Sequence, residues 1–218
     1  MKIQNIKSER KIGWMKIIAT FAIALLIFIS GLYMGTVITQ SKVNDILSVE
    51  KQARLELDNM AVEGLLLEEN PCLDPTHLSE SLNDLGVKLT YLEAQYNKNN
   101  PKILELKKPY TLLEIRHYLS MKKMIENCNY NYTLVLFFYS NSEEKIDESE
   151  EQGFVLDYLG KKFDNLKIYS FDSDLDMPTI KTIKEVYGIT VTPSTVIDGK
   201  VYAGFHDKDE LEEVLSKQ

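Results

Sequence analysis

Two cysteines are the residues of this chain with the most restricted chemistry. Cys72 and Cys128 are the only cysteines, and the sequence contains no Cys-x-x-Cys motif. An even number of cysteines outside the cytoplasm usually forms disulfides, so we predict a Cys72–Cys128 bond. Two buried free thiols are the alternative. A redox-active pair is the least favoured interpretation, because no cluster of positive charge near either cysteine would lower a thiol pKa.

Carboxylates form a second group with chemical potential. They follow two predicted strands, at Glu143, Glu144, Asp147, Glu148, Glu150, Glu151, Asp172, Asp174 and Asp176. The loops after two parallel strands emerge at one edge of a sheet, where carboxylates bind hard cations or a basic partner. The last three aspartates have the spacing that begins an EF-hand loop, but Met177 and Ile183 replace its glycine and closing glutamate. We therefore predict no metal site, and favour a solvated loop near helix N-termini.

A serine nucleophile has little support in this sequence. Ser149 would need a base beside it, and the three histidines are poorly placed in sequence to serve. His77 and His117 lie in a predicted helical segment, and His206 follows the last predicted strand. We expect Ser149 to be a residue at the start of a helix, and we predict no cofactor.

An apolar segment near the N-terminus predicts a membrane anchor. Residues 17–38 are uncharged and, at about 1.5 Å per residue, long enough for a bilayer core. A cleaved signal peptide is the alternative, but its apolar region is usually shorter. The basic tail 1–16 precedes the segment, so the positive-inside rule places the tail in the cytoplasm and the rest of the chain outside. Gly31 and Gly35 form a GxxxG motif, which can bring two such helices together as a homodimer.

Residues 41–128 have the apolar spacing of helices. A first seam runs from Val43 to Leu67, and a second seam comprises Leu78, Leu82, Leu85, Leu89, Leu92 and Tyr96. A parallel coiled coil between two chains and an intramolecular hairpin both fit this spacing, and the short breaks favour the hairpin. After Pro109 we predict a third helix over residues 111–127. In such a bundle both cysteines lie at the end away from the membrane.

The third helix has its own predicted inward face. Leu112, Ile115, Leu119 and Ile125 are the apolar residues that we assign to it. The whole segment 41–128 then forms a helical stalk outside the membrane.

Residues 130–218 alternate between strand and helix patterns. Predicted strands cover residues 133–139 and 166–171, and a hairpin of two short strands flanks Asp198-Gly199. Predicted helices cover 150–163 and 178–187, and a last one follows Asp207. The order is βαβαββα. The segment from 129 to the end has nine basic and 18 acidic residues, so it would repel phosphates and we predict no nucleic-acid binding.

This order, together with the sequence Gly188-Ile-Thr-Val-Thr-Pro193-Ser-Thr-Val-Ile197, resembles the thioredoxin-like superfamily over about residues 130–218. The resemblance implies an α/β thioredoxin-like fold and a cis bond between Thr192 and Pro193. It also implies that this proline faces the start of the first helix, where the family has its redox cysteines. The equivalent positions here are about Ile146 and Ser149, neither of which forms a disulfide.

The resemblance therefore predicts a fold without the usual dithiol chemistry. We predict a membrane-anchored extracytoplasmic protein that is redox-inactive at the usual site and acts as a binding or scaffold module. Ile146, Ser149, Thr192 and Pro193 would form a groove for an extended peptide, held by backbone pairing. A divergent thiol–disulfide oxidoreductase that uses Cys72 and Cys128, or cysteines of a partner, is the alternative. A purely structural envelope protein is a third hypothesis.

Overall fold

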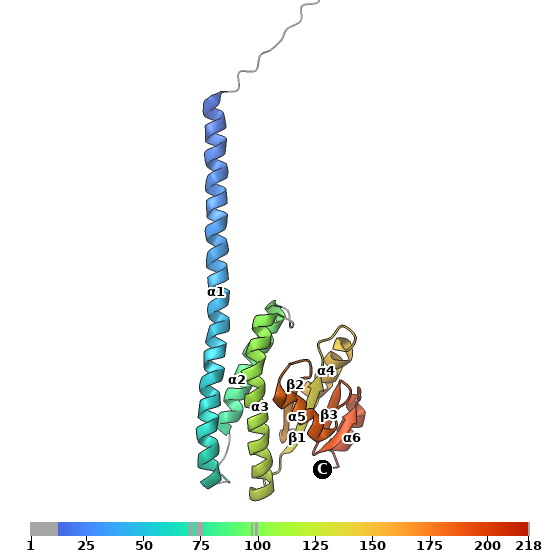
Figure 1. Cartoon of the computed structure of the whole chain (residues 1–218). Helices are drawn as coiled ribbons and strands as arrows, with labels where there is room; N and C mark the ends of the chain where they lie inside the picture. Colours follow the sequence, from blue (N-terminus) through green and yellow to red (C-terminus); the bar gives the residue numbers. More distant parts are fainter. Residues whose placement is uncertain (1–12, 70–71, 73–75, 97, 99, 218) are drawn as a thin grey trace, which may run out of the picture. The chain divides into compact units, whose positions relative to one another are not determined.

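The computed structural model describes residues 13–69, 72, 76–96, 98 and 100–217 (Figure 1). Its elements, in chain order, are α1 (Trp14–Glu69), α2 (Thr76–Tyr96), α3 (Pro101–Cys128), β1 (Thr133–Tyr139), α4 (Ile146–Lys162), β2 (Leu166–Asp172), α5 (Pro178–Tyr187), β3 (Ser194–Ile197), β4 (Lys200–Ala203) and α6 (Lys208–Leu215). Contacts divide the chain into two compact units, residues 1–45 and 46–218, and each is described by itself.

The first unit contains the apolar start of α1. Within the described residues, Trp14–Thr36 is the one stretch of helix long and apolar enough to cross a bilayer, with a mean hydropathy of 2.4 over the span. Its side chains are all exposed. The predicted apolar helix over residues 17–38 is therefore present, and it begins three residues earlier. A membrane anchor and a signal sequence share this length and composition.

The helix α1 continues without a break past residue 41 and ends at Glu69. The side chains of the first predicted seam, from Val43 to Leu67, lie outside the described part of the structure, as does the side chain of His77.

The helix α2 buries the apolar stripe that its sequence predicts. Four leucines of the second seam are almost inaccessible to solvent, namely Leu82, Leu85, Leu89 and Leu92. They belong to one hydrophobic core together with residues of α3, β1, β2 and α5. The seam therefore packs within the chain, against α3 and the C-terminal sheet.

The helix α3 differs from its prediction in length and in face. It begins at Pro101 instead of residue 111, with the side chain of Asn100 accepting a hydrogen bond from the amide of Lys102 at 3.0 Å. Pro109 lies inside the helix. A proline in a helix interior costs about 3 kcal/mol, and the extensive burial of α3 on both sides of Pro109 offsets this cost.

The predicted inward face of α3 was wrong for Leu119, while Leu112, Ile115 and Ile125 pack against the edge of the core. Leu119 is 50 % exposed, and Leu112, Ile115 and Ile125 are only half-buried. The buried face instead carries Ile103, Leu106, Lys107, Thr111, Leu113, Glu114, His117, Tyr118, Met121 and Met124. Four of these residues are ionisable, namely Lys107, Glu114, His117 and Tyr118, and each has a polar partner on a neighbouring element, so an apolar pattern alone could not locate the face.

A four-stranded mixed sheet forms the centre of the C-terminal part, in the order β2-β1-β3-β4. β1 pairs parallel with β2, while β3 pairs antiparallel with both β1 and β4. The hairpin between β3 and β4 turns at Asp198 and Gly199, whose φ angles of 47° and 85° suit the tight turn that their sequence predicts.

The two faces of the sheet have separate cores, because successive side chains of a strand point to opposite faces. Leu134, Leu136 and Phe138 of β1 point to the core shared with α2, α3 and α5. Val135 and Phe137 point to a second core. That second core is closed by α4 and α6, through Leu156, Leu159, Leu211 and Leu215.

Candidate functional site

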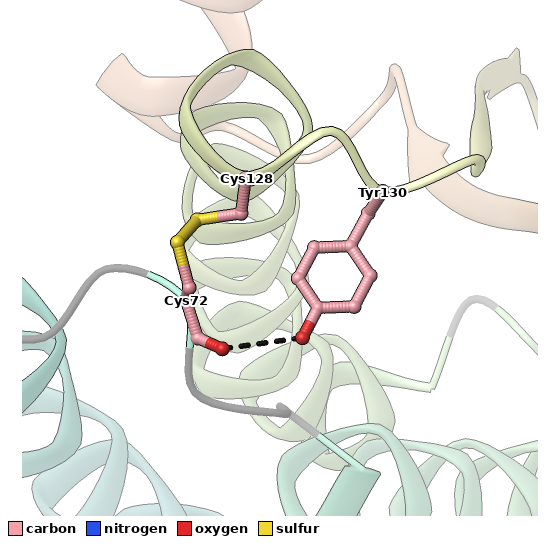
Figure 2. Close-up of a disulfide and its surroundings, with 3 residues drawn as sticks. All are labelled: Cys72, Cys128 and Tyr130. Atoms are coloured by element: carbon pink, nitrogen blue, oxygen red, sulfur yellow. Dashed lines mark hydrogen bonds between the residues drawn. A yellow bond between two sulfur atoms is a disulfide. The ribbon is translucent and has the colours of Figure 1, made fainter.

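The two cysteines form the predicted disulfide. The Sγ atoms of Cys72 and Cys128 are 2.01 Å apart (Figure 2). The hydroxyl of Tyr130 donates a hydrogen bond to the carbonyl oxygen of Cys72 at 3.2 Å. The disulfide and this hydrogen bond together link Cys72, which follows α1, to the end of α3. Since the sequence has no other cysteine, this form of the chain has no free thiol.

The helix α4 begins at Ile146, one of the two positions at which the resemblance places redox cysteines. Ile146 is half-buried, and Ser149 is 4 % exposed. The Oγ of Ser149 accepts a hydrogen bond from the backbone amide of Ser140, just beyond the end of β1, at 3.1 Å. The hydroxyl thus satisfies a buried amide at the end of the strand, as expected for a structural residue at the start of a helix.

The segment before β3 lies at the same end of β1. The Thr192–Pro193 peptide bond is cis. Ser194 pairs with Phe138, so Pro193 lies next to the end of β1, where Ser149 also binds. Pro193 is buried and Thr192 half-buried. The carbonyl of Pro193 accepts a hydrogen bond from the amide of Gly204 at 2.9 Å, and the carbonyl of Val191 accepts one from the hydroxyl of Ser194 at 2.8 Å.

The aspartates after β2 have partners within the chain. The Oδ2 of Asp174 accepts hydrogen bonds from the hydroxyl of Ser140 and the amide of Asn141, so the loops after β1 and β2 do meet at one edge. Asp176 is exposed and paired with Lys181. Asp172 is only 2 % exposed, so the expected solvated loop was wrong for this residue. Among the described residues, no group of three or more potential metal ligands occurs.

Asp172 belongs to a buried ionic cluster that joins three elements. The Nζ of Lys107, on α3, lies 2.7 Å from a carboxylate oxygen of Asp172 on β2 and 2.8 Å from one of Glu93 on α2. Asn141 donates a further hydrogen bond to Asp172 at 2.8 Å. Burial alone would lower the pKa of Lys107, but the two carboxylates outweigh it and raise the pKa above its ordinary value. We call Glu93, Lys107 and Asp172 the ionic cluster.

Glu114 is a second buried acid on α3. Its Oε1 accepts a hydrogen bond from the backbone amide of Ser170 at 3.1 Å, while its Oε2 has no hydrogen-bond partner. A hydrogen bond between the Glu114 side chain and Tyr110 favours the ionised form, as does the bond from Ser170. Burial is the largest effect and raises the pKa of Glu114 to about 8. The carboxyl is therefore mostly neutral at pH 7.

His117 completes the polar face of α3. Its Nδ1 lies 2.7 Å from the hydroxyl of Tyr169, and its Nε2 lies 3.0 Å from the hydroxyl of Ser79. Burial, followed by the charge of Lys167, lowers its pKa to about 4, so the ring is neutral at physiological pH. The ring links α2, α3 and β2 and has no hydrogen bond to Ser149.

Two cavities open beside these residues, between α2, α3 and β2. One has a volume of about 430 Å³ and the other about 490 Å³. Tyr110 and Glu114 line both. The sequence does carry a signal for this site, since Lys107, Glu114 and His117 share one helical face. We missed it because polar residues in a predicted stalk are expected to face solvent.

No family model and no curated protein matches the sequence. Solved structures that it resembles include a malarial protein, with 16% identity over 40% of this chain and 97% of that one and a TM-score of 0.33. The germline-specific thioredoxin Deadhead of Drosophila melanogaster is 20% identical over 45% of this chain and 91% of its own, also with a TM-score of 0.33.

Neither match bears on activity, substrate or partner. The element order from β1 to α6 and the mixed sheet are themselves compatible with the thioredoxin-like fold that the sequence predicts.

Proposed function

We propose that this chain is a single-pass membrane protein that presents a thioredoxin-like binding or scaffold module outside the cytoplasm. In this proposal residues 1–16 form a cytoplasmic tail, residues 17–38 span the bilayer, and the helical segment 41–128 carries the domain 130–218. The domain is redox-inactive at the usual site, and the segment around Thr192 and Pro193 holds an extended peptide.

One observation carries the proposal: both cysteines are joined to each other, away from the start of α4. A thioredoxin-type reaction needs a thiolate that attacks a substrate disulfide. At the start of α4 the chain offers Ile146, which has no nucleophile, and the buried Ser149, whose hydroxyl accepts a backbone hydrogen bond. A binding role at this edge needs only accessible backbone and side chains, which favours it over dithiol catalysis.

A turnover assay separates binding from oxidoreduction. The full chain in detergent micelles is mixed with a disulfide-bonded peptide and reduced glutathione, and peptide reduction is followed. We expect no rate above the uncatalysed background. Turnover that disappears in Cys72→Ser or Cys128→Ser would instead establish the alternative, a divergent thiol–disulfide oxidoreductase.

A peptide selection tests the groove itself. Val191 is 47 % exposed beside Thr192, whereas Val186 is 70 % exposed on α5 and serves as a matched control. Peptides enriched from a random displayed library on the wild-type chain should bind Val191→Lys at least about tenfold more weakly and Val186→Lys equally well, since buried interface positions dominate affinity. Failure to enrich peptides, or equal binding to both variants, would favour a purely structural envelope protein.

The orientation in the membrane has its own test. Lys161 is exposed on α4, and its replacement in Lys161→Cys adds one free thiol to the domain. A membrane-impermeant maleimide should label this variant in intact cells, and mass spectrometry should find the N-terminal segment still attached. Labelling only after lysis would reverse the orientation, and loss of the first residues would show a cleaved signal peptide.

We also propose that the membrane helix pairs with a second copy through Gly31 and Gly35. A Cβ atom built at either glycine meets no atom within 4 Å, so this face has room for a close helix neighbour. Energy transfer between labelled copies in vesicles should fall in Gly31→Ile and Gly35→Ile. A signal unchanged by both substitutions would remove these glycines from the interface.

A further inference from the structure

The cavity of about 430 Å³ between α2, α3 and β2 has the size of a small-molecule site. Its wall is mixed, with carboxyl, imidazole, phenol and hydroxyl groups beside apolar residues. The residues that line it and enter the argument are Asn83, Tyr110, Glu114, Tyr132, Lys167 and Tyr169. The peptide segment around Pro193 contributes none of the residues that line this cavity, so the two proposals are independent.

Glu114 is a buried acid whose second carboxyl oxygen is left over. It is 3 % exposed, its Oε1 binds the amide of Ser170, and its Oε2 has no partner. The other buried carboxylate of this interface, Asp172, is neutralised by Lys107 at 2.7 Å. A polar atom buried without a partner costs about 1–3 kcal/mol, which makes a ligand that binds it favourable.

The same cavity offers aromatic rings that can hold a positive charge. Tyr110, Tyr132 and Tyr169 all line it. The ammonium group of Lys167 lies 5.2 Å from the centroid of the Tyr132 ring and occupies that ring, so Tyr110 and Tyr169 are the rings left for a ligand. Aromatic rings around a carboxyl group are the arrangement that proteins use to recognise ammonium ions.

We propose that this cavity binds a small organic ammonium ion, of about the size of benzylamine, with Glu114 as its counterion. The ammonium group lies beside the carboxyl group of Glu114, and the apolar part of the ligand lies among the tyrosine rings.

Binding is coupled to a proton. Glu114 is mostly protonated at pH 7, because burial raises its pKa to about 8. The other charged and titratable side chains that line the two cavities come from every neighbouring element: Lys107, Tyr110 and His117 on α3, Glu80 and Glu93 on α2, Tyr132 before β1, Tyr139 on β1, Asp157 on α4, and Lys167, Tyr169 and Asp172 on β2. An ammonium ion beside the carboxyl favours its ionised form. The acid then loses its O–H proton to solvent as the ion pair forms, so ligand binding at pH 7 releases protons.

Calorimetry of the full chain in detergent tests the proposal. Benzylamine is titrated at pH 7 in two buffers that differ in ionisation enthalpy, so that the released protons are counted. Glu114→Gln should weaken binding at least tenfold and abolish proton release. Glutamine has the shape of the neutral acid and can still accept from Ser170, so the fold should persist. Glu105→Gln, an exposed site on the same helix, is the matched control and should change affinity less than twofold.

A second variant blocks the cavity without touching the acid. Asn83 is exposed and lines both cavities, so Asn83→Trp should also weaken benzylamine binding while leaving unfolding unchanged. Equal affinity for benzyl alcohol would overturn the role of charge, and tighter binding of benzoate would assign the cavity to anions through Lys167. Absence of benzylamine binding, or binding retained in Glu114→Gln, would overturn the site.

Discussion

The two faces of the central sheet are built on different principles. The face covered by α4 and α6 is closed almost entirely by apolar side chains, and its buried polar residues are uncharged. The face covered by α2 and α3 buries Lys107, Glu114, His117 and Asp172 within its hydrophobic core. The face covered by α4 and α6, which we call the apolar face, packs by complementary shape. On the face covered by α2 and α3, which we call the polar face, each buried charge also needs an oppositely charged partner.

This difference teaches where specificity lies in the molecule. A buried ion pair often adds little to stability compared with apolar residues of the same size, yet removing one partner is strongly unfavourable. We expect the ionic cluster to disfavour any other register of α2 and α3 on β2, because a shifted helix would leave charges unpaired. Asp172 pairs with Tyr139 at the end of β1, so the cluster lies at the same end of the sheet as Ser149, which binds the amide of Ser140.

The largest expected effect comes from removing the shared cation of the ionic cluster. Lys107→Met leaves Asp172 and Glu93 buried without their counterion, so we expect the free energy of unfolding to fall by roughly 3–5 kcal/mol. Urea unfolding measures this change. Lys161→Met, which removes an exposed partner of Asp157, should change stability by less than about 0.5 kcal/mol.

A second substitution shows whether the loss reflects unpaired charge. Lys107→Met combined with Asp172→Asn removes the nearer carboxylate charge as well, and should recover part of the lost stability. If the double variant instead loses as much stability as the two single variants together, the two substitutions act independently. The loss in Lys107→Met would then reflect packing and not an unpaired charge, which would weaken the contrast between the two faces.

The disulfide is the next largest contribution, and it acts at the end of the polar face. Cys72 and Cys128 are separated by 56 positions, and closing a loop of this size stabilises a protein by about 2–4 kcal/mol. The double variant Cys72→Ala, Cys128→Ala should lose this amount in urea unfolding. Reductant should lower the stability of the wild-type chain and leave that of the double variant unchanged. If reductant destabilises both, its effect does not come from breaking the disulfide.

Glu114 and His117 give the polar face a pH dependence. The folded pKa of Glu114 is about 8 against an ordinary 4.5. Its stabilising contribution is therefore complete below pH 4.5 and is lost as the pH rises toward 8. Between pH 6.5 and 8 we expect the free energy of unfolding to fall by about 2 kcal/mol, since one pKa unit corresponds to about 1.4 kcal/mol. Glu114→Gln should flatten this decline.

His117 has the opposite sign. Its folded pKa is about 4 against an ordinary 6.5, so its contribution is complete above pH 6.5 and is lost as the pH falls toward 4. Urea unfolding at several pH values should therefore show the two effects opposing each other between pH 4.5 and 6.5. If the stability of Glu114→Gln still declines above pH 6.5, as that of the wild-type chain does, another group causes the decline.

The smallest expected effect comes from replacing one glycine in a helix on each face of the sheet. A Cβ added at Gly86 in α2 would lie 2.6 Å from the hydroxyl of Tyr110, whereas one added at Gly153 in α4 would lie 3.8 Å from Phe137. Alanine is favoured over glycine in a helix by up to about 1 kcal/mol. Thermal unfolding should show this gain in Gly153→Ala and none in Gly86→Ala. Equal gains would mean that Tyr110 moves aside without cost.

Much of the fold could be predicted from local patterns. The hairpin at Asp198-Gly199, the strand at residues 133–139 and the leucine stripe of α2 each depend on a repeat or a turn within a few residues. The start of α3 and its buried face could not be predicted in this way. A proline inside a helix and charged residues in a core are both unfavourable locally, and only distant partners make them acceptable.

The sequence by itself determined the order of helices and strands in the C-terminal part. It also showed that the chain has only two cysteines, far apart in the sequence. It also placed an apolar helix at the N-terminus, since length and hydropathy need no tertiary information. Only the tertiary structure decided that Lys107, Glu114 and His117 face inward, because their burial depends on Glu93, Asp172, Ser170 and Tyr169 from other elements. A charge is costly to bury until its partner is in place, and that partner is defined by the fold rather than by the neighbouring residues.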